Sequence, residues 1–294
     1  MFRLRRYLCA ILLALSAASR AEVTVTDATG EPVTLSRPAE RIVSLSPHIT
    51  EQLFTIGAGP AIVATVEWSD YPEPARALPR VGSSGAINLE VLLRHNPDLV
   101  IAWRSGNGDQ VIERLRALGL KVYVQEPRHL ADIATEIVRL GELTGRGAEA
   151  RAAADDFRGR IDELRVTFSY RRPVRVFQQI WNRPMISLNG EHLVSDVIRL
   201  CGGRNIFADA PTLVVNTSLE SVVLANPQVI VVSEADGVPP DWMREWQQWP
   251  GIDAVANDQL YVINPDLLHR HTLRIAEGAE LMCRYIDKAR QLLD

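Results

Sequence analysis

Four short segments rich in aromatic and polar residues each follow a predicted β-strand, and their residue types suit ligand binding. They are Trp68-Ser69-Asp70-Tyr71-Pro72, Trp103-Arg104-Ser105-Gly106-Asn107, Trp181-Asn182-Arg183-Pro184 and Asp266-Leu267-Leu268-His269-Arg270-His271. Tryptophan offers a large, rigid contact surface, while aspartate and arginine can orient a polar ligand through hydrogen bonds. Because open α/β sheets bind ligands at the carboxyl ends of their strands, the segments predict a cleft between two lobes.

Assembled catalytic motifs are missing from this sequence. It has no Gly-x-Ser-x-Gly, His-Glu-x-x-His, Cys-x-x-Cys or Gly-x-x-x-x-Gly-Lys pattern. His269 and His271, with Asp266 close in the chain, are candidate metal ligands, although surface histidines are common. They keep open a secreted metal-dependent enzyme as the alternative from another class. The sequence favours a binding protein over an enzyme.

Short apolar runs alternate with helical patterns along the chain. The predicted strands are 42–45, 62–66, 99–103 and 121–125 in the first half and 174–181, 229–232 and 260–263 in the second, after a β-hairpin over 23–33. Continuously apolar strands separated by helices are typical of parallel sheets covered on both faces. The pattern predicts an α/β fold class with two Rossmann-like lobes and mainly parallel sheets.

A different composition separates the two halves. Residues 148–167 are rich in Ala, Arg, Asp and Glu, and Phe157, Ile161 and Leu164 recur at helical spacing. One long bridging helix is therefore expected. The predicted boundaries are an N-terminal lobe over 22–147, the bridging helix over 148–172 and a C-terminal lobe over 173–294.

Length and composition are those of an ordinary globular protein, with 294 residues of which 47% are hydrophobic and 23% charged. This excludes a disordered, collagen-like or coiled-coil chain, and a net charge of −4 does not favour nucleic acid as a partner.

The first 21 residues have the pattern of a secretory signal peptide. Arg3, Arg5 and Arg6 form a basic start, an apolar run covers 8–15, and Ser19-Arg20-Ala21 is a small-x-small cleavage site. The segment holds four of the 32 Lys and Arg residues and none of the 36 Asp and Glu residues, so its removal takes the net charge from −4 to −8. No later stretch approaches the roughly 18 apolar residues of a membrane span, so a soluble exported protein is expected.

Two cysteines, Cys201 and Cys283, remain after the signal peptide. In an oxidising compartment they can form one internal disulfide. Two buried free thiols are the alternative that the residues alone leave open.

A sequence element is repeated at a displacement of 130 residues. Asn88-Leu89-Glu90 precedes Asn96-Pro97 and a buried strand, and Ser218-Leu219-Glu220 precedes Asn226-Pro227 and another buried strand. Asn and Ser are good N-caps, and a glutamate in the first turn is favoured by the helix dipole. The glutamates are either helix-starting residues or two matched acidic contacts for a partner with two-fold symmetry.

The sequence resembles the periplasmic substrate-binding proteins of bacterial ABC importers for cobalamin, siderophores and haem, and it is most similar to the cobalamin-binding members. The resemblance covers nearly all of the chain from Arg41. It rests on residues 41–47, 69–72, 88–90, 97–104, 201–207 and 266–270. It implies two α/β lobes bridged by one long helix, a periplasmic location, no catalysis, no cofactor, and an ABC permease dimer as the partner of a monomeric receptor.

Positions carried over from the resemblance form the expected binding site. The residues placed around a cobalamin-like corrinoid are His48, Trp68, Ser84, Trp103, Met185, Val214, Asp266, Leu268 and Arg270. The resemblance also implies that Glu90 and Glu220 dock onto the permease and that Cys201 and Cys283 form a disulfide.

Several positions depart from the family pattern. Trp68 stands where a tyrosine is common, and Ser84 and Val214 stand where the cobalamin binders have tryptophans, which removes two apolar walls. His269 and His271 flank Arg270 where those relatives have no histidine. A haem or ferric-siderophore receptor of the same class is therefore the nearest alternative.

Overall fold

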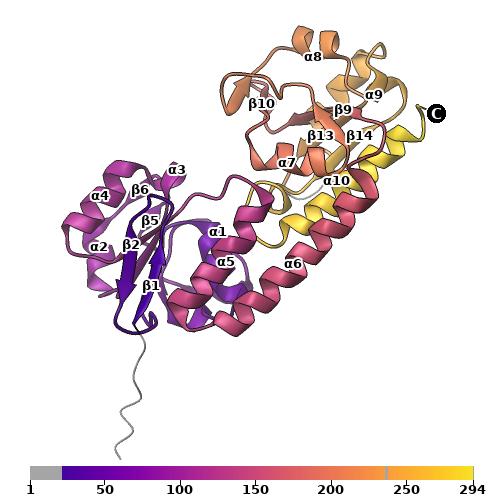
Figure 1. The fold of residues 1–294 in the computed structure, drawn as a ribbon. Helices are drawn as coiled ribbons and strands as arrows, with labels where there is room; N and C mark the ends of the chain where they lie inside the picture. Colours follow the sequence, from indigo (N-terminus) through magenta and orange to yellow (C-terminus); the bar gives the residue numbers. More distant parts are fainter. Residues whose placement is uncertain (1–21, 236–237, 294) are drawn as a thin grey trace, which may run out of the picture.

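The computed structural model describes residues 22–235 and 238–293, so the predicted signal peptide over residues 1–21 lies outside the described part. Two α/β lobes are joined along one side by long helices (Figure 1). Each lobe has its own four-stranded sheet, and the predicted fold class is confirmed. Within the described residues, no helix combines the length and the apolar character that crossing a bilayer requires.

The N-terminal lobe contains a parallel sheet in the order β4-β3-β7-β8. Its strands are β3 (Ile42–Ser44), β4 (Ile62–Ala64), β7 (Leu99–Trp103) and β8 (Val122–Gln125). The helices are α1 (Pro47–Thr55), α2 (Leu89–Arg94), α3 (Arg104–Asn107), α4 (Asp109–Ala117) and α5 (Leu130–Thr144), with 3-10 turns η1 (Gly59–Ala61) and η2 (Glu73–Ala77). Two antiparallel hairpins pair β1 (Val23–Thr26) with β2 (Pro32–Leu35) and β5 (Gly82–Ser83) with β6 (Ala86–Ile87).

Alternate residues of strand β7 belong to two different hydrophobic cores. Leu99 and Ile101 pack on one face of the sheet, while Val100 and Ala102 pack on the other. Successive strand residues point to opposite faces, so a strand covered on both sides must be apolar throughout. This explains why the strand is a continuous apolar run.

The C-terminal lobe contains a second parallel sheet in the order β11-β9-β13-β14. Its strands are β9 (Val174–Gln179), β11 (Gly203–Asn205), β13 (Val229–Ser233) and β14 (Leu260–Ile263), and a separate antiparallel pair joins β10 (Ile186–Leu188) to β12 (Val214–Asn216). The helices are α7 (Leu193–Leu200), α8 (Leu219–Ala225), α9 (Asp253–Ala256) and α10 (Ile275–Arg290), with 3-10 segments η3 (Asp241–Gln248) and η4 (Pro265–Leu267).

The two parallel sheets share one topology. Counted along the chain, the second strand of each sheet lies at an edge beside the first, and the third and fourth follow on the other side. Helices α2 and α8, which begin with the repeated Leu-Glu element, each precede the third strand of their sheet. The sequence repeat therefore corresponds to a structural repeat.

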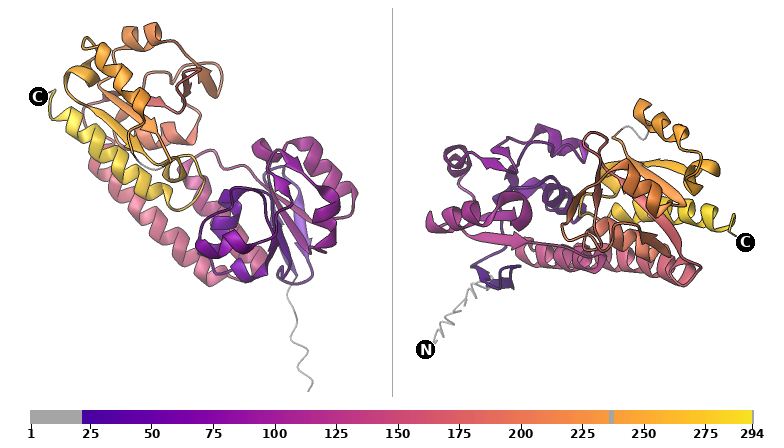
Figure 2. Two further views of the ribbon diagram at one scale, coloured as in Figure 1. Left: turned by 180° about the vertical axis from the view of Figure 1, so that it is seen from behind. Right: turned by 90° about the horizontal axis from the view of Figure 1, so that it is seen from above.

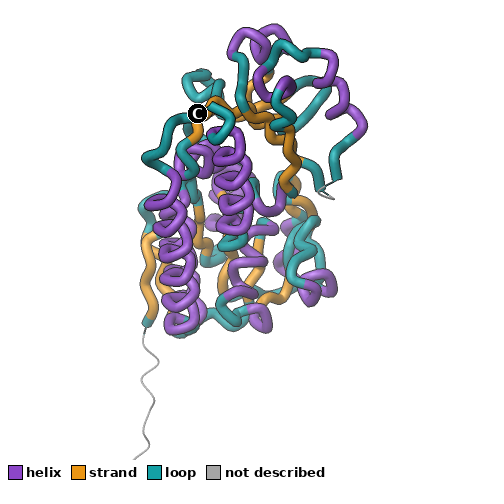
Figure 3. Tube along the Cα trace, turned by 90° about the vertical axis from the view of Figure 1, so that its right-hand side faces the viewer, coloured by secondary structure: helices purple, strands orange, loops and turns teal. Residues whose placement is uncertain are grey.

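Helix α6 (Gly147–Phe168) covers most of the segment 148–172 in which we expected the bridging helix; it begins one residue earlier and ends four residues earlier. Its buried residues Ala150, Ala154, Phe157 and Ile161 form one stripe at helical spacing. Both views in Figure 2 show α6 running beside the lobes, and Figure 3 shows the long helices along one side of the molecule.

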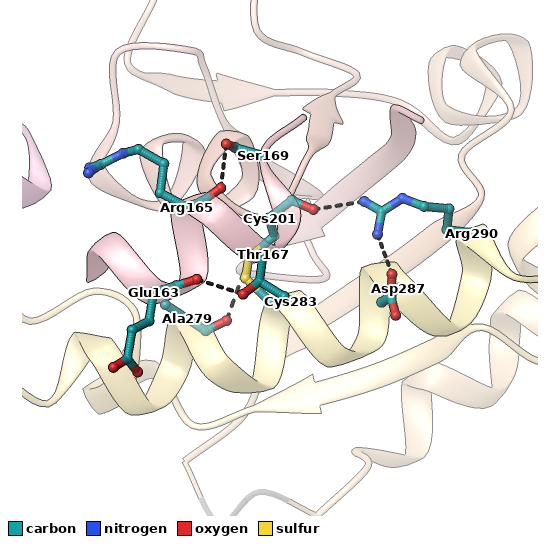
Figure 4. The surroundings of a disulfide bond; sticks show 9 residues. All are labelled: Glu163, Arg165, Thr167, Ser169, Cys201, Ala279, Cys283, Asp287 and Arg290. Carbon is teal, nitrogen blue, oxygen red and sulfur yellow. Dashed lines mark hydrogen bonds and ion pairs between the residues drawn. A yellow bond between two sulfur atoms is a disulfide. The ribbon is translucent and has the colours of Figure 1, made fainter. Parts of the chain in front are cut away.

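A disulfide joins Cys201, at the end of α7, to Cys283 in α10 (Figure 4). It confirms the pairing implied by the family resemblance and excludes two free thiols. Beside it, Arg290 donates a hydrogen bond of 2.8 Å to the backbone oxygen of Cys201. The C-terminal helix is thus fastened to the C-terminal lobe by a covalent bond and a hydrogen bond.

Replacing Cys201 and Cys283 by alanine should lower the free energy of unfolding by about 2–4 kcal/mol, because the bond restricts the unfolded chain over a separation of 82 residues. Urea denaturation of the oxidised protein and the double variant measures this difference. Wild-type protein in reducing agent keeps both sulfur atoms and should show a similar loss. Equal stability of the oxidised and reduced proteins would contradict the prediction.

Candidate functional site

The chain between β14 and α10 crosses from the C-terminal lobe to the N-terminal lobe. In this crossing segment, residues 264–274, the backbone oxygen of His271 accepts a hydrogen bond of 2.6 Å from Nε2 of Gln52, which lies in α1. The segment thereby brings side chains that follow the strands of both sheets into one region.

Arg270 is the polar centre of this region. Its guanidinium lies 2.8 Å from Oδ1 of Asp266 and 3.0 Å from Oδ1 of Asp70 in the N-terminal lobe. Nη2 also donates to the backbone oxygen of Trp68 at 3.5 Å. The side chain of Arg270 is only 16% exposed, so the structure brings the predicted site residues Trp68 and Asp266 together around a largely buried cation.

Trp68 has an unusual conformation for a tryptophan. Its φ is +65°, a left-handed value that L-residues other than glycine rarely adopt, and the residue is 76% exposed. Strained backbone and exposed aromatic surface both concentrate at binding sites. Trp68 is therefore placed as a ligand contact of the N-terminal lobe would be.

Arg274 forms a second ionic link between the lobes. Its Nε and Nη2 donate to the two carboxylate oxygens of Glu51 at 2.7 and 2.6 Å, and its guanidinium lies 3.7 Å from the centre of the Tyr71 ring. Glu51 is buried in α1. A bidentate pair in a buried position fixes the geometry of the crossing segment against the N-terminal lobe.

Replacing Glu51 by glutamine should destabilise the protein by about 3 kcal/mol, because it leaves the largely buried guanidinium of Arg274 without its counter-charge. Thermal or urea unfolding measures the change. The matched control is Glu73→Gln, which removes the exposed pair between Glu73 and Arg76 and should change the stability by less than about 1 kcal/mol. Equal effects of the two variants would show that the Glu51 pair does not hold the lobes together.

Aromatic rings form a cluster under the crossing segment. Trp103, at the end of β7, lies with its ring centre 5.3 Å from that of His48 and 5.6 Å from that of His271, and the two imidazole centres are 5.2 Å apart. Nδ1 of His48 is 2.7 Å from Oγ of Ser46, while its buried Nε2 has no hydrogen-bond partner among the described residues. Trp103 and His48 are thus predicted site residues that contact each other.

Four histidines lie along the junction of the lobes. Nε2 of His269 is 2.8 Å from Oγ of Ser233, and the His269 ring centre is 6.0 Å from that of His192. Burial, together with neighbouring imidazoles, lowers the pKa of His192 and of His271 to about 4 and that of His269 to about 3, and burial also lowers the pKa of His48 well below its usual value. These rings are neutral at pH 7.

The metal-ligand hypothesis for His269 and His271 finds no coordinating set. Among residues 22–235 and 238–293, no three or more His, Cys, Asp or Glu side chains are grouped so that they could hold a metal ion. His269 contacts a serine hydroxyl and His271 contacts aromatic rings instead.

A cavity of about 830 Å³ opens at the carboxyl ends of β9 and β13. It is lined by residues 180–183 and 233–235 and by Trp242, Glu245, Pro265 and His269. Trp181 is 61% exposed, and its Nε1 donates to the backbone oxygen of Arg183, which leaves the apolar ring face free for contact. A volume in this range suits a small-molecule ligand.

Trp242 and His192 lie at the site although neither is among the residues expected there from the sequence. Trp242, Trp246 and Trp249 recur at helical spacing, which predicts a core-facing stripe, yet of the three only Trp246 is buried. The sequence feature that could have pointed to Trp242 is the presence of three tryptophans in one short segment, more than one buried helix face needs. His192 caps α7, and nothing in the sequence around it indicates that its ring lies close to that of His269.

The remaining predicted site residues lie in different surroundings. Ser84 is half-buried between β5 and β6, and its backbone oxygen accepts a hydrogen bond from Asn107. Val214 is about half exposed on β12, and half-buried Met185 borders a second, smaller cavity. Leu268 is completely buried in the hydrophobic core, so it anchors the crossing segment and presents no surface to solvent.

The two repeated glutamates lie on exposed helix starts in separate lobes (Figure 1). The side chain of Asn88 caps α2 through the amide of Val91, and the Ser218 hydroxyl caps α8 through the amide of Ser221. Glu90 forms an ion pair with Arg94.

Known proteins share this architecture over most of its length. The family model for periplasmic binding proteins matches residues 42–267. A vitamin B12-binding protein of Vibrio cholerae is 39% identical over 254 residues, which cover 86% of this chain and 91% of that relative.

Solved structures give the same result. The crystal structure of the periplasmic vitamin B12 binding protein of Vibrio cholerae matches with a TM-score of 0.79 at 40% identity, covering 86% of this chain and 98% of that one. A periplasmic heme-binding protein from Roseiflexus sp. RS-1 matches with a TM-score of 0.73 at 23% identity over 85% and 99% of the two chains, which is a likeness of fold alone. With two parallel sheets of identical topology and a family match over most of its length, this chain belongs to the periplasmic binding protein family.

Proposed function

We propose that this chain is a soluble periplasmic receptor that binds a cobalamin-like corrinoid between its lobes and delivers it to an ABC importer. The observation that carries the proposal is the crossing segment at the junction of the lobes, where Arg270 contacts Asp266 and the backbone of Trp68. In the same segment His271 contacts the Trp103 ring, and His269 lines the cavity that also exposes Trp181. The vitamin B12-binding relative of Vibrio cholerae supports the ligand class.

Charge favours a corrinoid over the other ligands of this class. Among the described residues, the cavity and the junction hold three cations, Arg183, Arg270 and Arg274. Five carboxylates lie beside them, Asp70, Asp266, Glu51, Glu234 and Glu245. An acidic excess opposes anionic ligands such as haem, with its two propionates, or a negatively charged ferric siderophore. A corrinoid presents neutral amides at its periphery, which can pair with carboxylates and guanidinium groups alike.

The expected contacts divide into apolar and polar ones. Contact surface for the ring and its substituents would come from His48, Trp68, Ser84, Trp103, Met185 and Val214. Leu268 would hold the crossing segment in place from the core. Asp266 and Arg270 would hydrogen-bond peripheral amides, and Arg270 would exchange part of its contact with Asp70 for the ligand. Burial of a large planar ligand supplies most of the affinity, and these polar groups set its orientation.

Isothermal titration of the mature protein with cyanocobalamin tests the proposal, with haemin and a ferric hydroxamate as parallel ligands. One site with a Kd of about 1 µM or tighter is expected for cyanocobalamin, together with quenching of tryptophan fluorescence. Binding of haemin in place of cyanocobalamin would transfer the function to the haem receptor, and a response to the hydroxamate alone would favour a siderophore receptor.

A further inference from the structure

Asp70 lies at the junction of the lobes and is not one of the residues expected around the ligand. It brings a carboxylate of the N-terminal lobe to Arg270, with 3.0 Å between Oδ1 and Nη2. Asp266 holds Nε of the same guanidinium at 2.8 Å. Two carboxylates therefore share one cation, and the three side chains together carry one net negative charge.

The loop that carries Asp70 is fixed to the N-terminal lobe on both sides of this residue. Ser69 is completely buried, its hydroxyl oxygen lies 2.8 Å from that of Thr65, and its backbone oxygen accepts a hydrogen bond of 2.9 Å from Nη2 of Arg80. The backbone oxygen of Asp70 itself accepts from Nε of Arg76 at 3.1 Å. A carboxylate on such a loop is a preorganised charge that does not turn away from an approaching anion.

The neighbouring cation of the crossing segment is already engaged. Arg274 donates to both carboxylate oxygens of Glu51, at 2.7 and 2.6 Å, and this pair is electrically balanced. Within residues 22–235 and 238–293, Asp70 and Asp266 form ion pairs with Arg270 alone. The excess negative charge therefore stays beside Arg270.

Arg270 still has a donor to offer. Its Nε and Nη2 contact the two carboxylates and the backbone oxygen of Trp68, whereas Nη1 is buried without a hydrogen-bond partner among the described residues. A guanidinium group only donates, and an unpaired buried donor gains free energy from any acceptor that reaches it. A neutral amide oxygen can share the guanidinium with Asp70, but a carboxylate would bring a third negative charge to a single cation.

We propose that Asp70 is a specificity-determining residue, which makes the junction accept corrinoids whose side chains are amides and disfavour those that carry free carboxylates. This assignment rests on the proposed function and adds the class of side chain that the site selects. Arg270 alone would attract a carboxylate, because a guanidinium group binds one in a bidentate manner. Asp70 occupies part of that edge and repels a second anion, so selectivity comes from an opposing charge.

Corrinoids that differ in one side chain test this inference. Partial acid hydrolysis of cyanocobalamin yields monocarboxylates, in which one side-chain amide has become a carboxylate, and isothermal titration compares each with the parent. Wild-type protein should bind at least one of them about tenfold more weakly than cyanocobalamin. Asp70→Asn keeps the shape and an acceptor oxygen but removes the charge. It should raise the affinity for that monocarboxylate about five- to tenfold and change the affinity for cyanocobalamin less than about twofold.

Two further measurements isolate the charge of Asp70. Raising the salt concentration from about 0.05 M to about 0.5 M should narrow the difference between the two ligands in the wild-type protein. Glu73→Gln removes an exposed carboxylate, paired with Arg76, that lies three residues along the chain, and it should leave the ratio of the two affinities unchanged. Circular dichroism of both variants, compared with the wild type, verifies that the fold is retained.

The outcomes separate the two proposals. If the wild type binds every monocarboxylate as tightly as cyanocobalamin, or if Asp70→Asn leaves every affinity ratio unchanged, Asp70 does not set the selectivity and only this inference fails. If the wild type binds none of these corrinoids, the proposed function fails and the role of Asp70 fails with it.

Discussion

Replacing Glu90 and Glu220 together by alanine should reduce permease-dependent uptake about tenfold or more while leaving ligand affinity unchanged. The two carboxylates lie at the exposed starts of α2 and α8, one in each lobe, in equivalent positions of two sheets with the same topology. A partner with two-fold symmetry can meet both with one kind of basic group. Because two contacts act on one complex, losing both has a larger effect than losing either.

The two glutamates should not contribute equally. Glu90 already shares its charge with Arg94, whereas Glu220 forms no ion pair within the described part of the chain. A hydrogen bond from Ser218 lowers the pKa of the Glu220 carboxyl and keeps it ionised. Glu220→Ala alone should therefore impair uptake more than Glu90→Ala alone. Glu113→Ala combined with Glu163→Ala makes the same change in charge on α4 and α6, and it should have little effect. If the variant with Glu90→Ala and Glu220→Ala shows the same uptake as this control, docking through these two residues is ruled out.

Acidification from pH 7 to pH 5 should lower the free energy of unfolding by about 5 kcal/mol, with most of the change caused by buried histidines. The pKa values of His192 and His271 are about 4 and that of His269 is about 3, all below the usual 6.5 of an unfolded chain. Between these values and 6.5 the unfolded chain binds more protons than the folded one. Their contribution to stability is therefore complete above pH 6.5 and is lost as the pH falls towards the folded values.

Neutral replacements test the origin of this acid sensitivity. The variant with His192→Gln and His269→Gln cannot gain these two protons on unfolding, so its stability should fall less steeply between pH 7 and pH 5, even if its stability at pH 7 is lower. Urea titrations at several pH values measure the slope. His95→Gln replaces a histidine next to α2, outside this group, and serves as the control. Equal slopes for the wild type and the double variant would show that other groups cause the acid sensitivity.

The elements that the sequence predicted well are those with strong local patterns. The sequence predicts a strand over 99–103 and helices over 89–94 and 193–200, and these are the observed bounds of β7, α2 and α7. Continuous apolar runs, N-caps and apolar stripes are encoded within each of these segments. Strand β11 was not predicted, since Gly203-Arg204-Asn205 has no apolar run and becomes a strand only by pairing with β9. The sequence also predicts a helix over 241–249, but the structure forms the 3-10 segment η3 there, and the indole of Trp246 fixes it to the sheet. In β11 and in η3, contacts with distant parts of the chain determine the secondary structure.

The candidate site was predictable in its location but not in its internal contacts. Polar and aromatic residues after the strands predicted where the candidate site residues gather, because the carboxyl ends of parallel strands meet at one edge. The pairing of Arg270 with Asp70 joins residues 200 positions apart, and the proximity of His192 to His269 depends on the path of the crossing segment. Such contacts leave no local trace in the sequence. The burial of Leu268 was also hidden, because an apolar residue beside polar site residues can face either the core or the ligand.

Crystals of the mature protein grown with cyanocobalamin, measured at the cobalt absorption edge, test the binding mode most directly. We expect a single anomalous peak per molecule, between the lobes and bordered by Trp103, Trp181 and Arg270. A peak elsewhere on the protein, or crystals with no cobalt signal after saturation with the ligand, would contradict it.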